Sequence, residues 1–269
     1  MAGRLEGKVA LISGAARGQG RSHAVRLAQE GADIIAFDVC RQLPTVGYKM
    51  ATPEDLKETA KQVEDLDRRI IAREADVRDA AAVKALVEEG VAELGRLDIV
   101  SANAGIATFA PNAWSIEEDA WEETLAVNLT GVWKTLKAAI PAMLDAGNGG
   151  SIIITSSTAG IKGMAGIAHY DSAKHGVVGL MRTLAIELAP HSIRVNTVHP
   201  TGVNTPMVVN DYMAQFLDEE GGGANIENLL PVELVEAVDI SNAVLWLASD
   251  EARYVTGTCL PVDAGFLQK

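Results

Sequence analysis

The sequence predicts an α/β fold with a single Rossmann-type, doubly wound parallel sheet and helices on both faces. Short apolar segments of strand length alternate along the chain with longer segments in which apolar residues return every three or four positions. Such alternation is typical of a parallel sheet, and strands that are covered on both faces carry continuous Val and Ile runs. Right-handed crossovers then place helices on both sides.

The expected elements follow one another in this alternating order. Strands are expected within 9–13, 32–37, 69–77, 97–105, 151–157 and 193–200, and a final strand and turn within 254–265. Helices are expected over 18–30, 53–67, 80–94, 121–144 and 170–188. Thr52 with Asp55, and Ser115 with Glu118, have the spacing of helix capping boxes.

Length and charge narrow the classes of function. With 269 residues, 48% of them apolar, the chain can bury one core, and we expect a single domain over 1–269. Its 23 basic and 36 acidic residues give a formal charge of -13 without a basic stripe, so no nucleic-acid partner is expected. The five histidines lack metal-site spacing with carboxylates, and no metal is expected.

The N-terminus and the cysteines indicate where in the cell the protein is expected. The N-terminus shows no leader pattern and no apolar run reaches about 18 residues, so we expect a cytoplasmic protein without a membrane partner. Cys40 and Cys259 are expected to be free thiols.

A glycine-rich turn, SGAARGQG at 13–20, joins the first expected strand to the first expected helix. Its glycines permit tight backbone geometry and let a pyrophosphate approach the helix N-terminus closely. Because the turn follows a strand and opens a helix, it predicts a dinucleotide cradle. The residues expected in the cradle are Gly14, Arg17, Gly18, Gln19 and Gly20.

The type of cofactor depends on Asp38, which ends the second strand 24 positions after Gly14. A carboxylate there can accept hydrogen bonds from both hydroxyls of an adenine ribose, whereas a 2′-phosphate would meet like-charge repulsion. Arg17 argues the other way, because a guanidinium can pair with a 2′-phosphate, although a solvated loop residue is the alternative. We expect NAD, because Asp38 would lie closer to the hydroxyls.

Two later strand ends add residues to the expected cofactor site. Asp76 with Val77 ends the third strand, where the carboxylate can meet the adenine amino group. Asn103, Ala104 and Gly105 end the fourth, and small residues there let the backbone approach the cofactor. As alternatives, Asp76 can cap the next helix and Asn103 can stabilise the turn.

Tyr170 and Lys174 lie four residues apart, one turn along the same face of an expected helix. A nearby positive charge lowers the pKa of a phenol, so that Tyr170 can exchange a proton with a substrate oxygen. Ser157 ends a strand 13 residues earlier and can hold that oxygen, with Ser156 as a competing candidate. Asn128, a poor helix former, predicts a local break that exposes polar groups for a proton relay.

Together these residues resemble the short-chain dehydrogenase/reductase superfamily over essentially the whole chain. The resemblance implies that Tyr170 is the general acid/base, that Lys174 lowers its pKa and binds the nicotinamide ribose, and that Ser157 orients the substrate. It also implies that Asn128 supports the relay. A hydride would then pass between nicotinamide and a carbinol carbon.

Two further segments are similar to family segments. Residues 199–205 resemble the segment that holds the carboxamide, which implies this role for Val203 and Thr205, although Thr201 interrupts the family's usual Pro-Gly pair. The region 254–265 contributes to a tetramer in the superfamily, so a homotetramer is implied; an edge strand covered within one subunit is the alternative.

An insert at about 39–56 makes the stretch from Asp38 to Asp76 longer than the superfamily usually has. With RRIIAREADVRD at 68–79 and VNTPM at 203–207, the chain is similar to the mycofactocin-associated, carveol-dehydrogenase-like subgroup of actinobacteria. That resemblance implies NAD held tightly beneath the insert, reoxidation in place by an external redox carrier (mycofactocin), and a secondary alcohol such as a terpenoid as substrate. The alternative is a surface loop without catalytic consequence.

The segment at about 205–230 mixes apolar side chains with a triple glycine at 221–223. We expect a lid over a small apolar secondary alcohol or ketone, with a short helical pair as the alternative. An NADP-dependent ketoacyl-type reductase is disfavoured by Asp38 and the negative charge. A non-catalytic NAD-binding protein is disfavoured by the intact set of Ser157, Tyr170 and Lys174.

Overall fold

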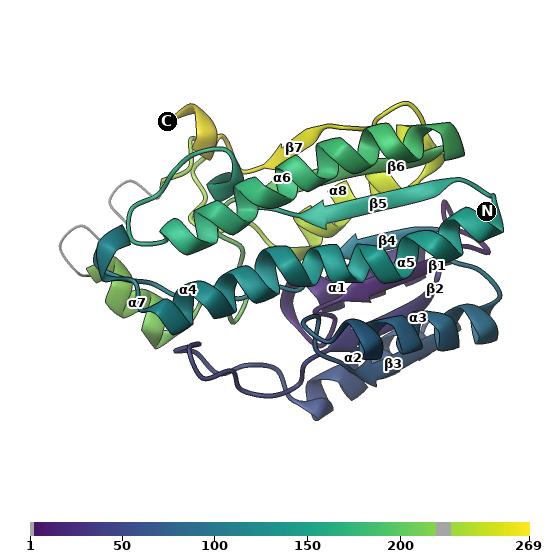
Figure 1. Cartoon of the computed structure of the whole chain (residues 1–269), viewed down its shortest axis with the longest axis horizontal. Helices are drawn as coiled ribbons and strands as arrows, with labels where there is room; N and C mark the ends of the chain where they lie inside the picture. The colour runs from purple at the N-terminus through teal and green to yellow at the C-terminus, as the bar shows by residue number, and fades with distance from the viewer. Residues whose placement is uncertain (1–2, 219–226) are drawn as a thin grey trace.

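The structure is a computed structural model that describes residues 3–218 and 227–269. In this part of the chain, seven strands form one parallel sheet in the order β3-β2-β1-β4-β5-β6-β7 (Figure 1). The strands are β1 (Val9–Ser13), β2 (Asp33–Asp38), β3 (Ile70–Glu74), β4 (Ile99–Ala102), β5 (Gly150–Thr155), β6 (Ile193–Pro200) and β7 (Cys259–Val262). The expected α/β class with a doubly wound parallel sheet is confirmed.

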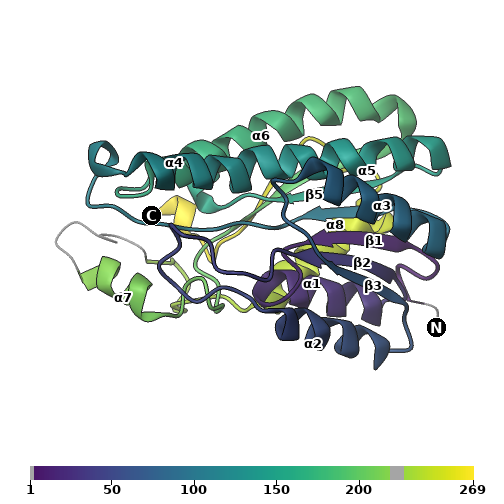
Figure 2. The same cartoon turned by 60° about the horizontal axis from the view of Figure 1, so that its bottom comes forward.

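Helices cover both faces of this sheet (Figure 2). One face carries α1 (Gly18–Gln29), α2 (Pro53–Glu64) and α8 (Ala237–Ala248), and the other carries α3 (Ala80–Leu94), α5 (Val132–Ala146) and α6 (Ala168–Leu188). The helices α4 (Glu118–Leu125) and α7 (Asp211–Asp218) lie near the carboxyl ends of the strands (Figure 1). Single turns of 3-10 helix are η1 (Ala113–Ser115), η3 (Thr158–Gly160), η4 (Ala189–His191), η5 (Asp250–Ala252) and η6 (Phe266–Gln268).

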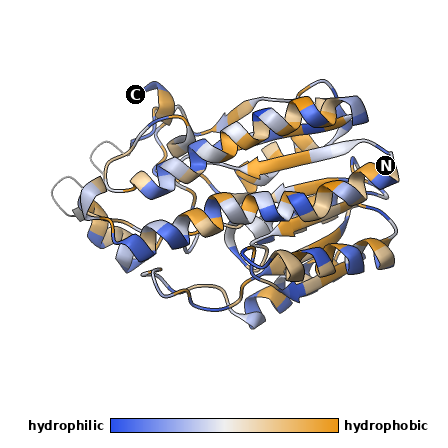
Figure 3. Cartoon of the chain, viewed as in Figure 1, coloured by the Kyte–Doolittle hydropathy of each residue, from blue (hydrophilic) through white to orange (hydrophobic). Residues whose placement is uncertain are grey.

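Two apolar cores explain the uninterrupted apolar strands. In β1, Leu11 packs into the core beneath α3, α5 and α6, whereas Ala10 and Ile12 pack into the core beneath α1, α2 and α8. Successive side chains of a strand point to opposite faces, so both faces of β1 are apolar. Figure 3 shows most of the strand residues as hydrophobic, whereas hydrophobic and hydrophilic residues are mixed along the helices.

The predicted helix over 121–144 is interrupted where Asn128 suggested a break. A π-helical turn, η2 (Ala126–Gly131), joins α4 to α5. The capping box at Thr52 and Asp55 is confirmed. The one at Ser115 is wrong, because its hydroxyl donates to the Asn112 carbonyl and α4 begins after Glu117 without a side-chain cap.

Two regions of the sequence analysis take a definite form here. The insert runs as a packed, irregular segment from the end of β2 to the start of α2, so the expected range 39–56 includes the first turn of that helix. Of the segment 205–230, α7 is described, and the triple glycine at 221–223 lies outside the described residues. Cys40 and Cys259 are both free, as expected. None of the described helices has the length and apolar character needed to cross a membrane.

Candidate active site

A cleft crosses the carboxyl ends of β1 to β4. Its walls come from the glycine turn, the ends of β2 and β3, the insert, the segment after β4 and residues 205–207. The predicted cofactor residues that line it are Gly14, Arg17, Gly18, Gln19, Gly20, Asp38, Asp76, Val77, Asn103, Ala104, Gly105 and Thr205. Val203 does not line the cleft, because its side chain is buried in the core beneath α1 and α8.

Glycines shape the floor of the cleft in two ways. Gly14 has a φ of +67°, and a Cβ there would lie 2.8 Å from the Ala104 Cα, so the protein's own packing requires a glycine. Gly105 is different, because a Cβ there would make only ordinary contacts. It would lie 3.6 Å from the Lys174 Nζ. A side chain at position 105 would fit the protein but would fill the space between the glycine turn and Lys174. Its absence leaves room for a ligand.

The start of α1 offers unpartnered polar groups to such a ligand. The N-cap residue Arg17 makes no side-chain capping bond, so the first N–H groups and the positive end of the helix dipole face the cleft. Gln19 borders the cleft, and its buried Oε1 accepts no hydrogen bond from the described residues. A buried oxygen without a donor costs about 1–3 kcal/mol. These features fit the pyrophosphate of a dinucleotide.

Asp38 and Arg17 favour NAD over NADP. The Asp38 carboxylate accepts hydrogen bonds from the backbone N–H groups of Ala16 (3.0 Å) and Cys40 (3.5 Å). Burial raises the pKa of this carboxyl, and the backbone donors oppose the rise. The Arg17 guanidinium donates to the Lys49 carbonyl oxygen in the insert at 2.5 Å. Arg17 is therefore bound to the insert through one of its N–H groups.

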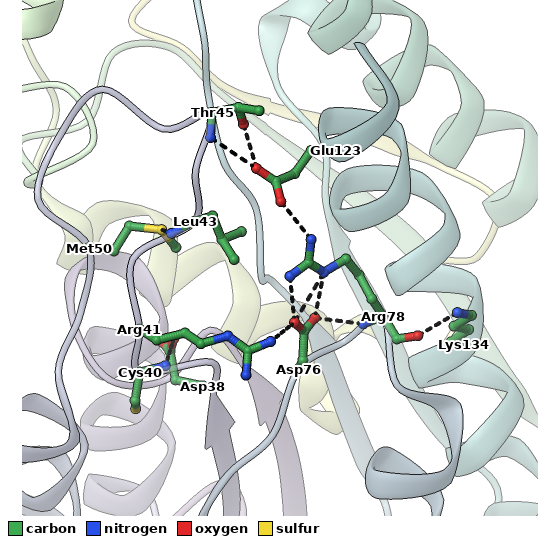
Figure 4. Close-up of polar contacts among 10 residues, drawn as sticks. All are labelled: Asp38, Cys40, Arg41, Leu43, Thr45, Met50, Asp76, Arg78, Glu123 and Lys134. Carbon is green, nitrogen blue, oxygen red and sulfur yellow. Dashed lines mark hydrogen bonds and ion pairs between the residues drawn. The ribbon is translucent and has the colours of Figure 1, made fainter. Parts of the chain in front are cut away.

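Asp76 lies at the centre of an ion-pair network (Figure 4). Its carboxylate is 2.7 Å from Arg78 Nη2 and 2.9 Å from Arg41 Nη2. Burial acts to raise the pKa of Asp76, but the hydrogen bonds and charges of these arginines bring the pKa below its usual value. The capping alternative is wrong, because Asp79 caps α3 with its own side chain.

The side chain of Asn103 stabilises the turn, as its alternative predicted. It donates to the Ser13 carbonyl oxygen at 3.2 Å and accepts from the Thr155 hydroxyl at 3.2 Å. The side chain thereby ties β1, β4 and β5 together at the edge of the cleft, while Ala104 and Gly105 continue the floor.

Ser157, Tyr170 and Lys174 meet beyond Gly105, at the carboxyl end of β5. The Ser157 side chain lies close enough to the Tyr170 phenol to act on its pKa, which it lowers. The Lys174 ammonium is buried, donates to the Thr155 carbonyl oxygen at 2.8 Å and lies 5.4 Å from the centre of the Tyr170 ring. The arrangement brings a hydroxyl, a phenol and an ammonium to one point, which suits proton exchange with a substrate oxygen.

The two candidate serines differ in their contacts. The Ser156 hydroxyl is buried and donates to the Lys174 carbonyl oxygen at 3.0 Å, so it anchors α6 to β5. The Ser157 hydroxyl contacts Tyr170 and accepts from the Ala159 N–H at 3.2 Å. The geometry therefore favours Ser157 as the residue that meets the substrate.

Burial dominates the proton affinities of the set. It raises the pKa of the Tyr170 phenol to about 12, a rise that the hydrogen bond from Ser157 opposes, and it lowers the pKa of Lys174 to about 8. The expected lowering of the tyrosine pKa is wrong for the protein as described. Removal from water disfavours the phenolate, and Lys174 directs its ammonium to the Thr155 carbonyl oxygen.

Asn128 is fully buried and holds the segment after β4. Its Oδ1 accepts from the Ile106 N–H and its Nδ2 donates to the Ile106 carbonyl oxygen, both at 2.8 Å. The predicted break is therefore present, but the side chain does not offer the exposed polar group that we expected. By binding both the N–H and the carbonyl oxygen of Ile106, Asn128 also positions the neighbouring Gly105.

Two tyrosines bind the segment after β4; Tyr212 belongs to the expected lid, whereas sequence reasoning gave Tyr48 no role. The Tyr48 hydroxyl, from the insert, accepts from the Ala107 N–H at 3.4 Å, and the Tyr212 hydroxyl, from α7, accepts from the Phe109 N–H at 3.1 Å. Gly47 packs on the Tyr212 ring, where a Cβ would lie 2.6 Å from the ring carbon Cδ2. The excess length of the insert was the one signal in the sequence.

Asp171, next to Tyr170, provides a test of burial at the site. Burial raises the pKa of its carboxyl to about 6, against the hydrogen bond from the Met164 N–H. A carboxyl whose folded pKa exceeds its unfolded value of 3.8 destabilises the fold progressively as the pH rises from 3.8 through 6. Asp171→Asn should thus raise the unfolding free energy by about 1 kcal/mol at pH 8 and change it little at pH 4. Urea unfolding at both pH values measures this, and equal effects at the two would contradict it.

Comparison with known proteins identifies the family. The family described as enoyl-(acyl carrier protein) reductase matches residues 14–267. The (-)-trans-carveol dehydrogenase of Rhodococcus erythropolis is 52% identical over 271 residues, which cover 97% of this chain and 98% of that protein. The crystal structure of carveol dehydrogenase from Mycobacterium avium in complex with NAD is 57% identical, with a TM-score of 0.95 over 99% of this chain and 100% of that one.

A short chain dehydrogenase from Mycobacterium paratuberculosis, bound to NAD, is 48% identical, with a TM-score of 0.94 over 99% of this chain and 100% of that one. These likenesses extend over the sheet, the glycine turn and the insert alike. The chain therefore belongs to the short-chain dehydrogenase/reductase family.

Proposed function

We propose that the protein interconverts a small apolar secondary alcohol and its ketone with NAD as cofactor, and that a terpenoid alcohol such as carveol is the substrate. The observation that carries this proposal is the clustering of Ser157, Tyr170 and Lys174 next to Gly105, one of the residues that line the cleft, together with the Asp38 carboxylate in the cleft itself. The NAD-bound structures and the carveol dehydrogenase among the relatives support it. Engagement of Arg17 by the insert disfavours the NADP-dependent ketoacyl-type alternative.

In the oxidative direction, each residue of the set has a separate role at the substrate hydroxyl. Ser157 holds the substrate oxygen, and Tyr170 in its phenolate form, which a pKa of about 12 makes the minor form near neutral pH, receives the substrate proton as the carbinol C–H bond breaks. NAD, when bound, supplies the acceptor of the hydride. Lys174 keeps its positive charge beside the phenol and lies next to the open space above Gly105, where a nicotinamide ribose would lie. Asn128 keeps that floor in place through Ile106.

The substrate side of the site is apolar. The rings of Phe109 and Phe216 stack with their centroids 4.5 Å apart, and Tyr212 lies 5.3 Å from Phe109. Two of these aromatic rings belong to α7, so this helix packs over the segment after β4. The packing supports α7 as the cover of an apolar substrate, in agreement with the lid that the sequence suggested.

We further propose that NAD is held beneath the insert and exchanges slowly, so that an external carrier such as mycofactocin reoxidises it in place. The insert is fastened to five different parts of the molecule. The contacts are Arg17 with the Lys49 carbonyl, Arg41 with Asp76, Thr45 with Glu123, Gly47 with Tyr212, and Tyr48 with Ala107. A dinucleotide under this cover can leave only after several of these contacts break, which disfavours the alternative of a loop without consequence.

Assembly and location are further proposals. The family resemblance supports a homotetramer, and β7 lies at the sheet edge with only part of its surface covered within this chain. Two free cysteines suit a reducing compartment such as the cytoplasm.

Quantifying the bound nucleotide tests the function and the retention together. Protein that is purified without added cofactor and dialysed should release close to one NAD per chain on denaturation, as measured by chromatography against NAD and NADP standards. A native sample of the same preparation should oxidise carveol with an artificial dye as electron acceptor. A protein that is empty but oxidises carveol with added NAD keeps the proposed reaction and loses the retention. Bound NADP would overturn the argument from Asp38.

A further inference from the structure

His199 is a fully buried histidine of β6 that the proposed reaction does not use. Its Nδ1 lies 2.7 Å from the Ser157 carbonyl oxygen, and its Nε2 lies 2.7 Å from the Thr197 hydroxyl. The ring therefore bridges β6 and the first residues after β5, directly behind the serine that contacts Tyr170.

The chemistry of the partners fixes which nitrogen carries the proton. A carbonyl oxygen can only accept, so Nδ1 must donate to Ser157. Burial, assisted by the charge of Lys174, lowers the pKa of His199, although the bond to Ser157 acts against this. The ring is then neutral, and Nε2 accepts from the Thr197 hydroxyl. Thr197 thus holds the tautomer that donates to Ser157.

This contact completes a series that anchors the end of β5 residue by residue. Lys174 Nζ donates to the Thr155 carbonyl oxygen at 2.8 Å, and the Ser156 N–H donates to the Val198 carbonyl oxygen at 2.9 Å. The first two anchors hold the strand. The bond from His199 acts on the peptide group that follows Ser157, whose rotation would move the serine side chain relative to Tyr170.

We propose that His199 is a positioning residue for alcohol oxidation, which sets the Ser157 hydroxyl against Tyr170 through its hydrogen bond to the Ser157 carbonyl. The same residue begins the segment 199–205, so it also joins the substrate serine to the cofactor side of the site. The inference rests on the proposed dehydrogenase function and is independent of whether NAD exchanges.

Three substitutions separate positioning from packing. His199→Asn places an amide N–H where Nδ1 was, His199→Gln places one where Nε2 was, and His199→Leu provides neither. The Asn variant should keep kcat for carveol within about threefold. The Gln and Leu variants should lose about 10- to 100-fold in kcat, because the Ser157 hydroxyl is no longer held in place. Their KM should change little, because a small displacement of one serine leaves the rest of the substrate site intact. Thr197→Val should cause a smaller loss, because it releases the tautomer. His191→Leu, at an exposed histidine, is the control.

Bound NAD and the midpoint of thermal unfolding are measured on the same preparations. Gln and Leu variants with wild-type kcat would overturn the inference, and so would equal losses in all three variants that follow their unfolding midpoints, since packing alone would then explain them. A wild-type protein that oxidises neither carveol nor cyclohexanol would instead overturn the proposed function, and the inference with it.

Discussion

Tyr170→Phe is expected to lower kcat for carveol oxidation by about 10²- to 10⁴-fold, the usual contribution of a positioned general acid or base. The substitution removes the hydroxyl on whose pKa Ser157 acts and leaves the ring beside Lys174. The cleft that would hold NAD is lined by other residues, so the variant should retain the same amount of nucleotide as the wild type. Dye-coupled turnover and nucleotide release from one preparation measure both quantities.

The matched control is Tyr254→Phe, because the Tyr254 side chain is 89% exposed and is not among the residues that line the cleft. It should behave as the wild type. A Tyr170→Phe variant that keeps full turnover would remove the proton-transfer role and would favour the non-catalytic NAD-binding alternative. A variant that loses NAD as well as turnover would show that the phenol contributes to the cofactor site more than the cleft geometry implies.

The sheet was largely predictable from the sequence because its strands, apart from the edge strands β3 and β7, are buried on both faces. The segments 9–13 and 193–200 coincide with β1 and β6, since a continuous apolar run has clear ends. The strand expected over 69–77 ends at Glu74, because Asp76 leaves the sheet to pair with arginines. The helix α8 was missed, because apolar residues occupy most of its positions and hide the helical period.

The site was predictable wherever a backbone geometry demands one residue type, as at Gly14, or a fixed helical spacing joins two groups, as at Tyr170 and Lys174. Contacts between distant segments left no such pattern. The pairing of Thr45 with Glu123 spans 78 positions, and neither residue stands out in the sequence. The pKa of Tyr170 depends on burial, which spacing alone cannot supply.

The second large effect is expected at Glu123, where the insert meets α4 (Figure 4). The carboxylate accepts from the Thr45 N–H at 3.2 Å and from its hydroxyl at 2.6 Å, and it pairs with Arg78 Nη1 at 2.7 Å. Glu123→Ala removes all three contacts and frees the tip of the insert. Water replaces part of what is lost, and a net loss equal to one hydrogen bond to a charged group, about 1.5–3 kcal/mol, makes NAD dissociate about 10- to 100-fold faster. Release into a large excess of buffer, followed by the fluorescence of the protein, measures the rate.

Glu122→Ala is the control, because Glu122 is exposed on the same helix and carries the same charge.

The pH dependence tests the ion pairs directly. Burial acts to raise the pKa values of Glu123 and Asp76. Hydrogen bonds from Thr45 and Arg78 bring the pKa of Glu123 below its usual value, and the hydrogen bonds of Arg78 with the charges of Arg78 and Arg41 do the same for Asp76. Groups with lowered folded pKa values stabilise the closed insert above their ordinary pKa and lose this effect as the pH falls through the lowered one. Retention of NAD should therefore be constant from pH 8 to about pH 5 and weaken only below about pH 4. Rapid release from the Glu122→Ala variant, or unchanged release from Glu123→Ala, would place the barrier to cofactor exchange elsewhere than in the insert.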